Sequence, residues 1–266
     1  RERSRCRERA DMLALVPASS CAAQPFAVDD NSASLPAFLS AQRLNVQAPL
    51  GSPRFEPESE DEVLTAIFAS WNLLDALMAV HEPALPHQTG YLRELQVRRM
   101  VQLVRQPGVN TYCEVGMNGG HSLIAMLLAN RRLKAHAFDL FKWKYSWPVA
   151  TLLNTSFGGR LSFHPGHSHN TLTEWTASAR AAGTRCDLVL VDGGHTFRAA
   201  RADVELLQSV ATPQSRLVID DIAMPPGYAL KVLNRTGTLV LLERYGPYAR
   251  RSRHSPCMRA PPGMNA

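Results

Sequence analysis

Residues 111–122 read Thr-Tyr-Cys-Glu-Val-Gly-Met-Asn-Gly-Gly-His-Ser, an apolar run followed by a turn rich in glycine. Glycine lets the backbone turn tightly and come close to a ligand, and a helix that follows such a turn offers free N–H groups. The spacing matches neither the GxGxxG motif of dinucleotide-binding folds nor the GxxxxGKS/T motif of a P-loop. Because many turns need glycine for shape alone, the stretch predicts a strand, a turn and a helix without deciding the ligand.

Short apolar runs alternate with helical stretches from residue 110 onward. The expected strands are Thr111–Val115, Ala135–Leu140, Leu161–His164, Leu188–Asp192, Leu217–Asp220 and Thr238–Glu243. The expected helices lie near residues 120–130, 147–157, 170–182, 197–210 and 228–235. Apolar strands separated by helices indicate a parallel sheet covered on both faces. The sequence therefore predicts an α/β fold with a doubly wound, Rossmann-like and mostly parallel sheet.

Two helices are expected ahead of this sheet. Ser59 precedes the acidic run Glu60-Asp61-Glu62, which suits the first turn of a helix, and a second helix is expected from Tyr91 to Arg105. The two helices either pack on the sheet or cover a site, and the sequence leaves both alternatives open. Six prolines among residues 17–59 are typical of a linker.

The domain organisation follows from these segments. We expect a disordered arm over residues 1–58 and a single domain over residues 59–248. Within that domain the N-terminal helices occupy residues 59–106 and the core occupies residues 110–244. A basic, proline-rich and disordered tail is expected over residues 249–266.

Composition and charge exclude several classes of protein. A chain that is 45% hydrophobic and 20% charged can bury a substantial core, so wholesale disorder is excluded. The net charge of +6 lies in the two tails, because residues 1–11 carry +2 and residues 244–266 carry +5. The body between them is nearly neutral, which argues against a nucleic-acid partner. No run of 18 apolar residues indicates a transmembrane helix. The short apolar run after the first arginines leaves a targeting peptide and the localisation open.

The cysteines give little sign of a covalent or metal framework. Five cysteines are an odd number without metal-ligand spacing, so neither a disulfide framework nor a zinc site is expected. Cys113 and Cys186 stand beside apolar runs and are expected in the core. Four histidines are also not expected to form a metal site: His164, His167, His169 and His195.

Polar residues gather where the expected strands end, the edge at which such sheets bind ligands. Asp139 ends the second strand, 25 residues after Glu114, where a carboxylate can accept the hydroxyls of a ribose or simply cap a helix. Asp192, Asp220 and Asp221 end the fourth and fifth strands. Three carboxylates at adjacent strand ends repel one another, and a divalent cation bound by oxygens relieves the repulsion. The alternative is that Asp192 and Asp220 cap helices or pair with arginine.

Taken in order, these motifs over residues 111–222 resemble a class I S-adenosylmethionine-dependent methyltransferase. Within that class the stretch is most similar to the metal-dependent O-methyltransferases of the catechol and macrocin type. The resemblance implies a methionine-binding loop anchored by Glu114 and Gly116, with Ser122 at the amino-acid moiety of the cofactor. The other cofactor residues that it implies are Asn118, Gly119 and Gly120 in the loop, Asp139 at the ribose, Ser168 at the adenine, and Asp192.

The resemblance also implies a metal-assisted reaction. Asp192, Asp220 and Asp221 fall on the metal positions, with Asp221 where catechol enzymes carry Asn. A divalent cation, expected to be Mg²⁺, would bind the hydroxyl of a small-molecule acceptor and lower its pKa. His195, which stands where catechol enzymes place Lys, would remove the proton. The acceptor and the oligomeric state are left open.

Three other functions share parts of this pattern. A nucleotide-binding oxidoreductase would use the same sheet and Asp139, but it would leave the carboxylates of Asp192, Asp220 and Asp221 unexplained. A hydroxylase-like relative and a non-catalytic binding module that keeps the cofactor fold are the remaining alternatives. The usual final antiparallel strand is hard to place in this sequence, which is a departure from the family.

Overall fold

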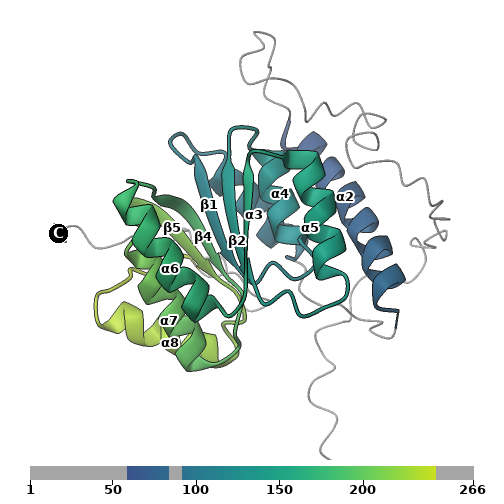
Figure 1. Cartoon of the computed structure of the whole chain (residues 1–266). Coiled ribbons are helices and arrows are strands. Elements are labelled where there is room, and N and C mark those ends of the chain that lie inside the picture. Colours follow the sequence, from purple (N-terminus) through teal and green to yellow (C-terminus); the bar gives the residue numbers. More distant parts are fainter. Residues whose placement is uncertain (1–58, 84–91, 244–266) are drawn as a thin grey trace, which may run out of the picture. The chain divides into compact units, whose positions relative to one another are not determined.

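The computed structural model describes residues 59–83 and 92–243 (Figure 1). In this part of the chain, five strands form one parallel sheet in the order β3-β2-β1-β4-β5. Their bounds are Thr111–Val115 for β1, Lys134–Asp139 for β2, Leu161–Pro165 for β3, Cys186–Val191 for β4 and Ala211–Ile219 for β5. The predicted α/β fold with a doubly wound parallel sheet is therefore confirmed. The strand order reverses between β1 and β4, which is the position where such sheets bind ligands.

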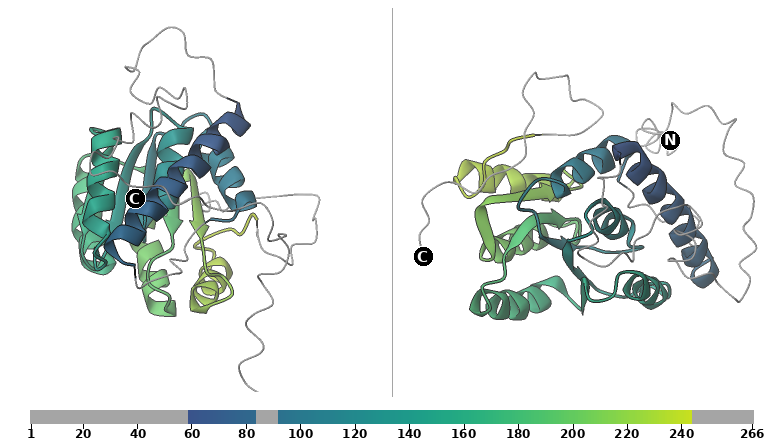
Figure 2. Two further views of the ribbon diagram at one scale, coloured as in Figure 1. Left: turned by 90° about the vertical axis from the view of Figure 1, so that its right-hand side faces the viewer. Right: turned by 90° about the horizontal axis from the view of Figure 1, so that it is seen from above.

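Within residues 59–83 and 92–243, seven helices cover the two faces of the sheet (Figures 1 and 2). One face carries α2 (Glu60–His81), α3 (Glu94–Val104), α4 (His121–Ala129) and α5 (Ser146–Phe157). The other face carries α6 (Ser168–Ala181), α7 (Phe197–Gln208) and α8 (Pro225–Arg235). Side chains alternate between the faces along each strand, so Tyr112 lies in the first core and Cys113 in the second.

Helix α2 begins where the sequence predicts. Ser59 Oγ accepts a hydrogen bond from the Glu62 N–H at 3.2 Å, and Glu62 Oε2 accepts one from the Ser59 N–H at 2.8 Å. This reciprocal pair is a capping box, which satisfies N–H groups that the helix itself leaves free. Among the described residues, α2 is the one helix long and apolar enough to cross a membrane by length and composition. Its buried residues, such as Ile67 and Leu74, belong to the core between the sheet and its neighbouring helices.

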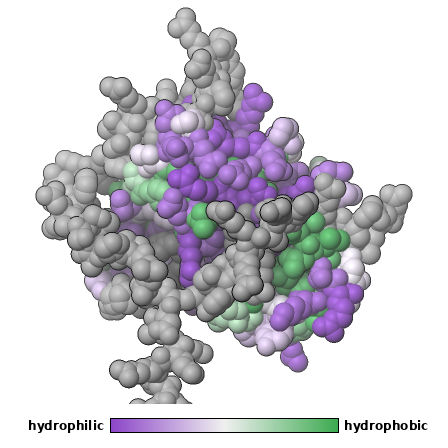
Figure 3. All heavy atoms as spheres, turned by 180° about the vertical axis from the view of Figure 1, so that it is seen from behind, coloured by the Kyte–Doolittle hydropathy of each residue, from purple (hydrophilic) through white to green (hydrophobic). Residues whose placement is uncertain are grey.

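The predicted sixth strand, Thr238–Glu243, is reduced to a single bridge residue, Val240. The segment adds no strand to the sheet within the described residues, and two of its backbone donors end α8 instead. The Leu239 N–H donates to the Leu233 carbonyl oxygen at 3.2 Å, and the Leu241 N–H donates to Asn234 Oδ1 at 2.8 Å. The segment leaves Val240 and Leu241 exposed. Figure 3 shows the molecule from behind, with a hydrophobic patch on the right. This side of the molecule holds β5 and α8, which lie on the left in Figure 1.

A disulfide joins Cys113 of β1 to Cys186 of β4, which corrects the expectation that the chain would have none. Both residues are fully buried in the second core, as expected, with their Cα atoms 5.9 Å apart. The two cysteines are 73 residues apart in the sequence, and they meet because β1 and β4 are neighbours in the sheet. Cysteine spacing contains no information about strand order, so it could not predict this bond.

Several expectations lie outside the described residues. These are the arm over residues 1–58, the tail over residues 249–266 and Tyr91, the first residue of the predicted second helix. Leu92 and Arg93 are described and are not helical, so that helix begins at Glu94, later than predicted. The proposed domain limits therefore stay predictions.

Candidate functional site

The loop after β1 is anchored from inside the protein by Glu114. This carboxyl group is fully buried, and the Ser122 hydroxyl donates a hydrogen bond to its Oε1 atom. Burial raises the pKa of Glu114 to about 8, the hydrogen bond from Ser122 lowers it, and the charge of Asp139 raises it. Ser122 therefore connects the first turn of α4 to the end of β1. The sequence placed Ser122 at the cofactor, whereas in the structure its hydroxyl is directed at Glu114.

Two glycines give the same loop its path. Gly116 has φ +95° and Gly120 has φ +78°, conformations that side chains rarely adopt. A Cβ atom on Gly116 would also overlap the carbonyl oxygen of Asp192. Gly120 precedes α4 directly, so the turn delivers the chain into the helix N-terminus. The loop from Gly116 to Gly120 thus lies at the ligand-binding edge of the sheet, as the sequence predicts.

Asp139, at the end of β2, binds backbone N–H groups of two loops, the loop after β1 and the loop that follows β2. Its Oδ2 atom accepts a hydrogen bond from the Asn118 N–H at 2.9 Å, and its Oδ1 atom accepts one from the Phe141 N–H at 2.7 Å. The Tyr145 hydroxyl donates to Asn118 Oδ1 at 2.5 Å. A carboxylate oxygen can accept more than one hydrogen bond. Asp139 therefore has a structural role and still has acceptor capacity for ribose hydroxyls.

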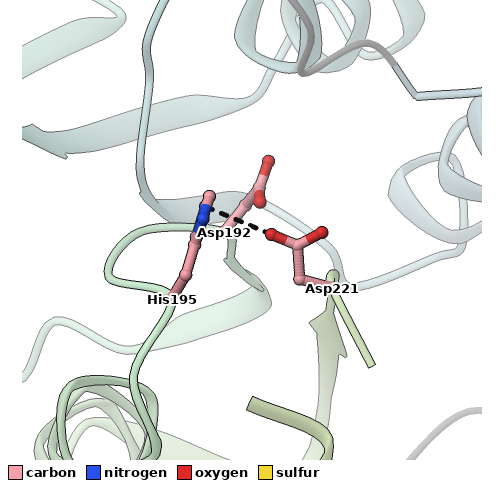
Figure 4. A group of neighbouring side chains, drawn as sticks. All are labelled: Asp192, His195 and Asp221. Atoms are coloured by element: carbon pink, nitrogen blue, oxygen red, sulfur yellow. Dashed lines mark ion pairs between the residues drawn. The ribbon is translucent and has the colours of Figure 1, made fainter. Parts of the chain in front are cut away.

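Three side chains converge at the ends of β4 and β5 (Figure 4). Ligand atoms of Asp192, His195 and Asp221 all lie within 4.8 Å of one another. Asp192 follows β4, His195 lies in the loop before α7, and Asp221 follows β5. His195 Nε2 is 3.1 Å from Asp221 Oδ2. Asp220 is not part of this group, since its Oδ1 atom accepts a hydrogen bond from the Asp221 N–H at 2.8 Å.

The group combines two carboxyl groups with one imidazole, and Asp220 lies next to it in the sequence. Burial, and after it the charges of Asp220, Asp221 and Glu114, raise the pKa of Asp192 to about 8. No Lys or Arg forms an ion pair with Asp192 within residues 59–83 and 92–243. Carboxylate oxygens beside one imidazole form a donor set that suits a divalent cation. The self-repulsion expected from the sequence is therefore present, and a cation would fit it.

His164 and His167 have other contacts among the described residues. His164 Nε2 lies 3.3 Å from His136 Nδ1, beneath α6 and in contact with Trp175. His167 precedes α6 as its N-cap residue, and Ser168 begins that helix. Ser168 therefore lies at the ligand edge of the sheet.

Sequence reasoning missed two contributions to the site. From α2, Trp71 Nε1 donates to the His121 carbonyl oxygen at 2.8 Å, and Asp75 Oδ1 lies 3.1 Å from His121 Nε2. These contacts fix the start of α4, and no local pattern announces them. The second is Asp203, a buried carboxyl group on α7. Its neighbours on the helix at Ala200, Val204 and Leu207 are also buried, so an acid on the apolar face was a usable signal.

Comparisons with known proteins agree with this fold. A protein-family model described as a methyltransferase domain matches residues 113–222. Cofactor-bound Rv0187 from MTB is similar in structure, with 15% sequence identity, a TM-score of 0.53, and coverage of 77% of this chain and 96% of that chain. An O-methyltransferase from Bacillus cereus in complex with SAH has 14% identity, a TM-score of 0.52, and coverage of 70% and 88%. No curated protein matches the sequence.

Proposed function

Because a methyltransferase-domain model matches residues 113–222, we propose that the protein uses S-adenosylmethionine to methylate a hydroxyl group of a small molecule with the help of a divalent cation. The observation that carries this proposal is the group of Asp192, His195 and Asp221. It lies beside the glycine turn after β1, because Gly116 contacts the backbone of Asp192. A methyl donor and an acceptor hydroxyl would therefore meet at one edge of the sheet.

The cofactor would lie across the carboxyl ends of the central strands. Its methionine moiety would lie along the turn from Gly116 to Gly120, where the N-terminus of α4 offers N–H groups to a carboxylate. Asn118 and Gly119 belong to that turn, and Glu114 would hold it in place through Ser122. The spare acceptor capacity of Asp139 would serve the ribose, and Ser168 would face the adenine. These assignments follow from the family resemblance and from where the loops end.

Asp192 and Asp221 would hold the cation, with Asp220 next to them as a third carboxylate. Their oxygen donors favour a hard ion such as Mg²⁺. When bound, such an ion lowers the pKa of a coordinated hydroxyl and orients it. Of the expected metal set, Asp192 and Asp221 belong to the group that contains His195, and Asp220 does not.

His195 would accept the proton of the acceptor hydroxyl. Its side chain is 56% exposed, so the molecule to be methylated can reach it. Asp221 lies 3.1 Å from its Nε2 atom and would orient the imidazole and stabilise its positive charge. In the transfer, the hydroxyl oxygen gains the methyl group, the sulfonium sulfur keeps the electrons of the broken S–C bond, and the proton passes to His195. The products are a methyl ether and S-adenosylhomocysteine.

Thermal unfolding tests this proposal before any acceptor is known. S-adenosylmethionine at about 100 times its Kd should add about 2.7 kcal/mol of stability, or roughly 5–10 °C in Tm. Added Mg²⁺ should change the Tm further, and EDTA should reverse that change. Asp192→Asn and Asp221→Asn should remove the response to Mg²⁺, whereas Asp61→Asn, at an exposed position on α2, should keep it. No shift with S-adenosylmethionine would contradict the cofactor, and a cation response unaffected by the site variants would contradict the metal site.

A further inference from the structure

Asp203 is an anomaly in the second core. Its side chain is 1% exposed, and neither carboxyl oxygen has a hydrogen-bond partner among the described residues. Buried polar groups in proteins are nearly always hydrogen-bonded, and an unpaired carboxyl group is costly to bury. Asp203 stands on the face of α7 that also buries Val204 and Leu207, where an apolar residue would pack without this cost. A carboxyl group at this position needs an explanation outside core packing.

The surroundings of Asp203 place it beneath the ligand edge of the sheet. A Cβ atom on Gly193, the residue after Asp192, would lie 3.6 Å from Asp203 Oδ2. Ser168, the first residue of α6, is near enough to the carboxyl group to interact with it. Burial raises the pKa of Asp203, whereas the Ser168 hydroxyl and the positive charges of His167 and His169 lower it. Asp203 and Ser168 stop short of a formed hydrogen bond in this structure.

The buried carboxyl group of Asp203 thus lies next to both the loop after β3 and the loop after β4. Ser168 belongs to the first loop and Gly193 to the second, and these loops flank the expected position of the adenine. The Ser168 hydroxyl can donate its one proton and accept through its oxygen. If the carboxylate of Asp203 receives that proton, the Ser168 oxygen is left facing outward as an acceptor. Adenine presents a donor, its 6-amino group, that such an acceptor would bind.

We propose that Asp203 is a positioning residue that selects adenine, by fixing the Ser168 hydroxyl as a hydrogen-bond acceptor toward the base. The inference rests on the proposed function, which places the adenine of the cofactor at Ser168. It adds a specificity device that touches neither the cofactor nor the acceptor. A base with a 6-oxo group, as in hypoxanthine, would bind poorly, because its oxygen and the Ser168 oxygen would both be hydrogen-bond acceptors.

Binding of two nucleosides tests the role of Asp203. S-adenosylhomocysteine and S-inosylhomocysteine differ in the 6-amino and 6-oxo groups, and calorimetry gives the ratio of their Kd values. The wild-type protein should prefer the adenosyl compound. Asp203→Asn keeps the shape but offers an amide N–H to Ser168, so the preference should fall about tenfold, as expected when a polar contact is mispaired. Ser168→Ala should reduce the preference by a similar factor. The double variant Ser168→Ala, Asp203→Asn should have the same ratio of Kd values as Ser168→Ala alone.

A structural role alone would give a different pattern. Val204→Ala, at the next buried position of α7, should lower the Tm and leave the ratio unchanged. If Asp203→Asn also lowers the Tm but keeps the ratio within twofold of wild type, the positioning role is wrong. If Asp203→Asn fails to fold, Ser168→Ala decides, because an unchanged ratio there overturns the proposal. If the wild-type protein binds neither compound, the proposed function fails instead.

Discussion

The backbones of Gly116 and Asp192 touch where the ends of β1 and β4 come together. A Cβ atom on residue 116 would overlap the carbonyl oxygen of Asp192. Both residues are fixed from their neighbours, since the Gly116 N–H donates to the Phe138 carbonyl oxygen and the Asp192 N–H to that of Val115, each at 2.8 Å. The glycine turn after β1 and the group of Asp192, His195 and Asp221 therefore share one backbone contact. We expect a change on one side to displace the other.

Gly116→Ala should abolish tight binding of S-adenosylhomocysteine, with a Kd at least about 30 times higher by calorimetry. The new methyl group would strain a backbone of φ +95° and push Asp192 away. Gly108→Ala is the matched control, because Gly108 has φ +88° with nothing within 4 Å of the added Cβ. It should cost about 1 kcal/mol of stability and leave the Kd unchanged. Equal effects of the two substitutions would show that backbone strain alone is responsible.

His195→Ala should slow methyl transfer by about 100-fold or more, the usual share of general base catalysis. The Kd for S-adenosylmethionine should stay the same, because the imidazole is assigned to the acceptor and not to the cofactor. A radiolabelled methyl group followed into an acceptor measures the rate. His81→Ala, at the end of α2, is the control. A rate near that of wild type would exclude His195 as the proton acceptor.

The free energy of unfolding should fall as the pH decreases from about 6.5 to about 4. Burial is the main cause that lowers the pKa of both His136 and His164 from 6.5 to about 4, so the unfolded chain binds protons that the folded protein refuses. Above pH 6.5 this stability is fully present, and it is lost toward pH 4. With partial solvent screening, the two residues should account for on the order of 2 kcal/mol.

Urea unfolding across this pH range measures the effect. The double substitution His136→Gln and His164→Gln should flatten the profile, because the group that takes up protons on unfolding is gone. His169→Gln, at an exposed position on α6, should reproduce the wild-type slope. A double variant with the slope of wild type would assign the pH dependence to other residues.

Trp71→Phe should loosen the start of α4 from α2. The substitution keeps an aromatic ring beside His121 but removes the donor to its carbonyl oxygen, which costs about 1 kcal/mol. Because α4 begins at His121, the Kd for S-adenosylhomocysteine should rise about fivefold, as 1 kcal/mol implies. Asn72→Ala, on the exposed side of α2, should change neither quantity. An unchanged Kd with lower stability would separate α2 from the cofactor site.

Reduction of the Cys113–Cys186 disulfide should lower the free energy of unfolding by about 2–4 kcal/mol, the usual range for a native cross-link. Urea titrations with and without a reducing agent measure this difference. The double variant Cys113→Ala and Cys186→Ala should be insensitive to the reducing agent. If the wild-type curve is also insensitive, the bond is not formed in solution.

The sheet could be predicted because its information is local. The runs that form β1 to β4 are apolar and end in, or are followed by, Gly or Asp, so a few neighbouring residues are enough to locate the end of each strand. Thr238–Glu243 has the same apolar look, yet its N–H groups at Leu239 and Leu241 serve α8, a competition that strand propensity does not include. A strand pattern shows that a segment is able to form a strand. Whether its backbone N–H groups are available to a neighbouring strand depends on tertiary contacts.

The candidate site divides in the same way. Asp192 and Asp221 were predicted because they end adjacent strands, and the structure brings them together with His195. Asp220 differs because one peptide group separates it from Asp221, and its carboxylate binds that N–H. The contact of Trp71 with His121 joins segments 50 residues apart, so it depends on how α2 packs.

The disulfide also gives the molecule an unusual covalent topology. Cys113 and Cys186 stand 73 residues apart, so the backbone between them closes into a ring that contains β2, β3 and the helices from α4 to α6. Glu114, Asp139 and Ser168 belong to this ring, whereas Asp192 lies just beyond it. A protease that cuts once inside the ring would therefore leave a single covalent molecule. It would migrate as one band on a non-reducing gel and as two fragments once the thiols are released.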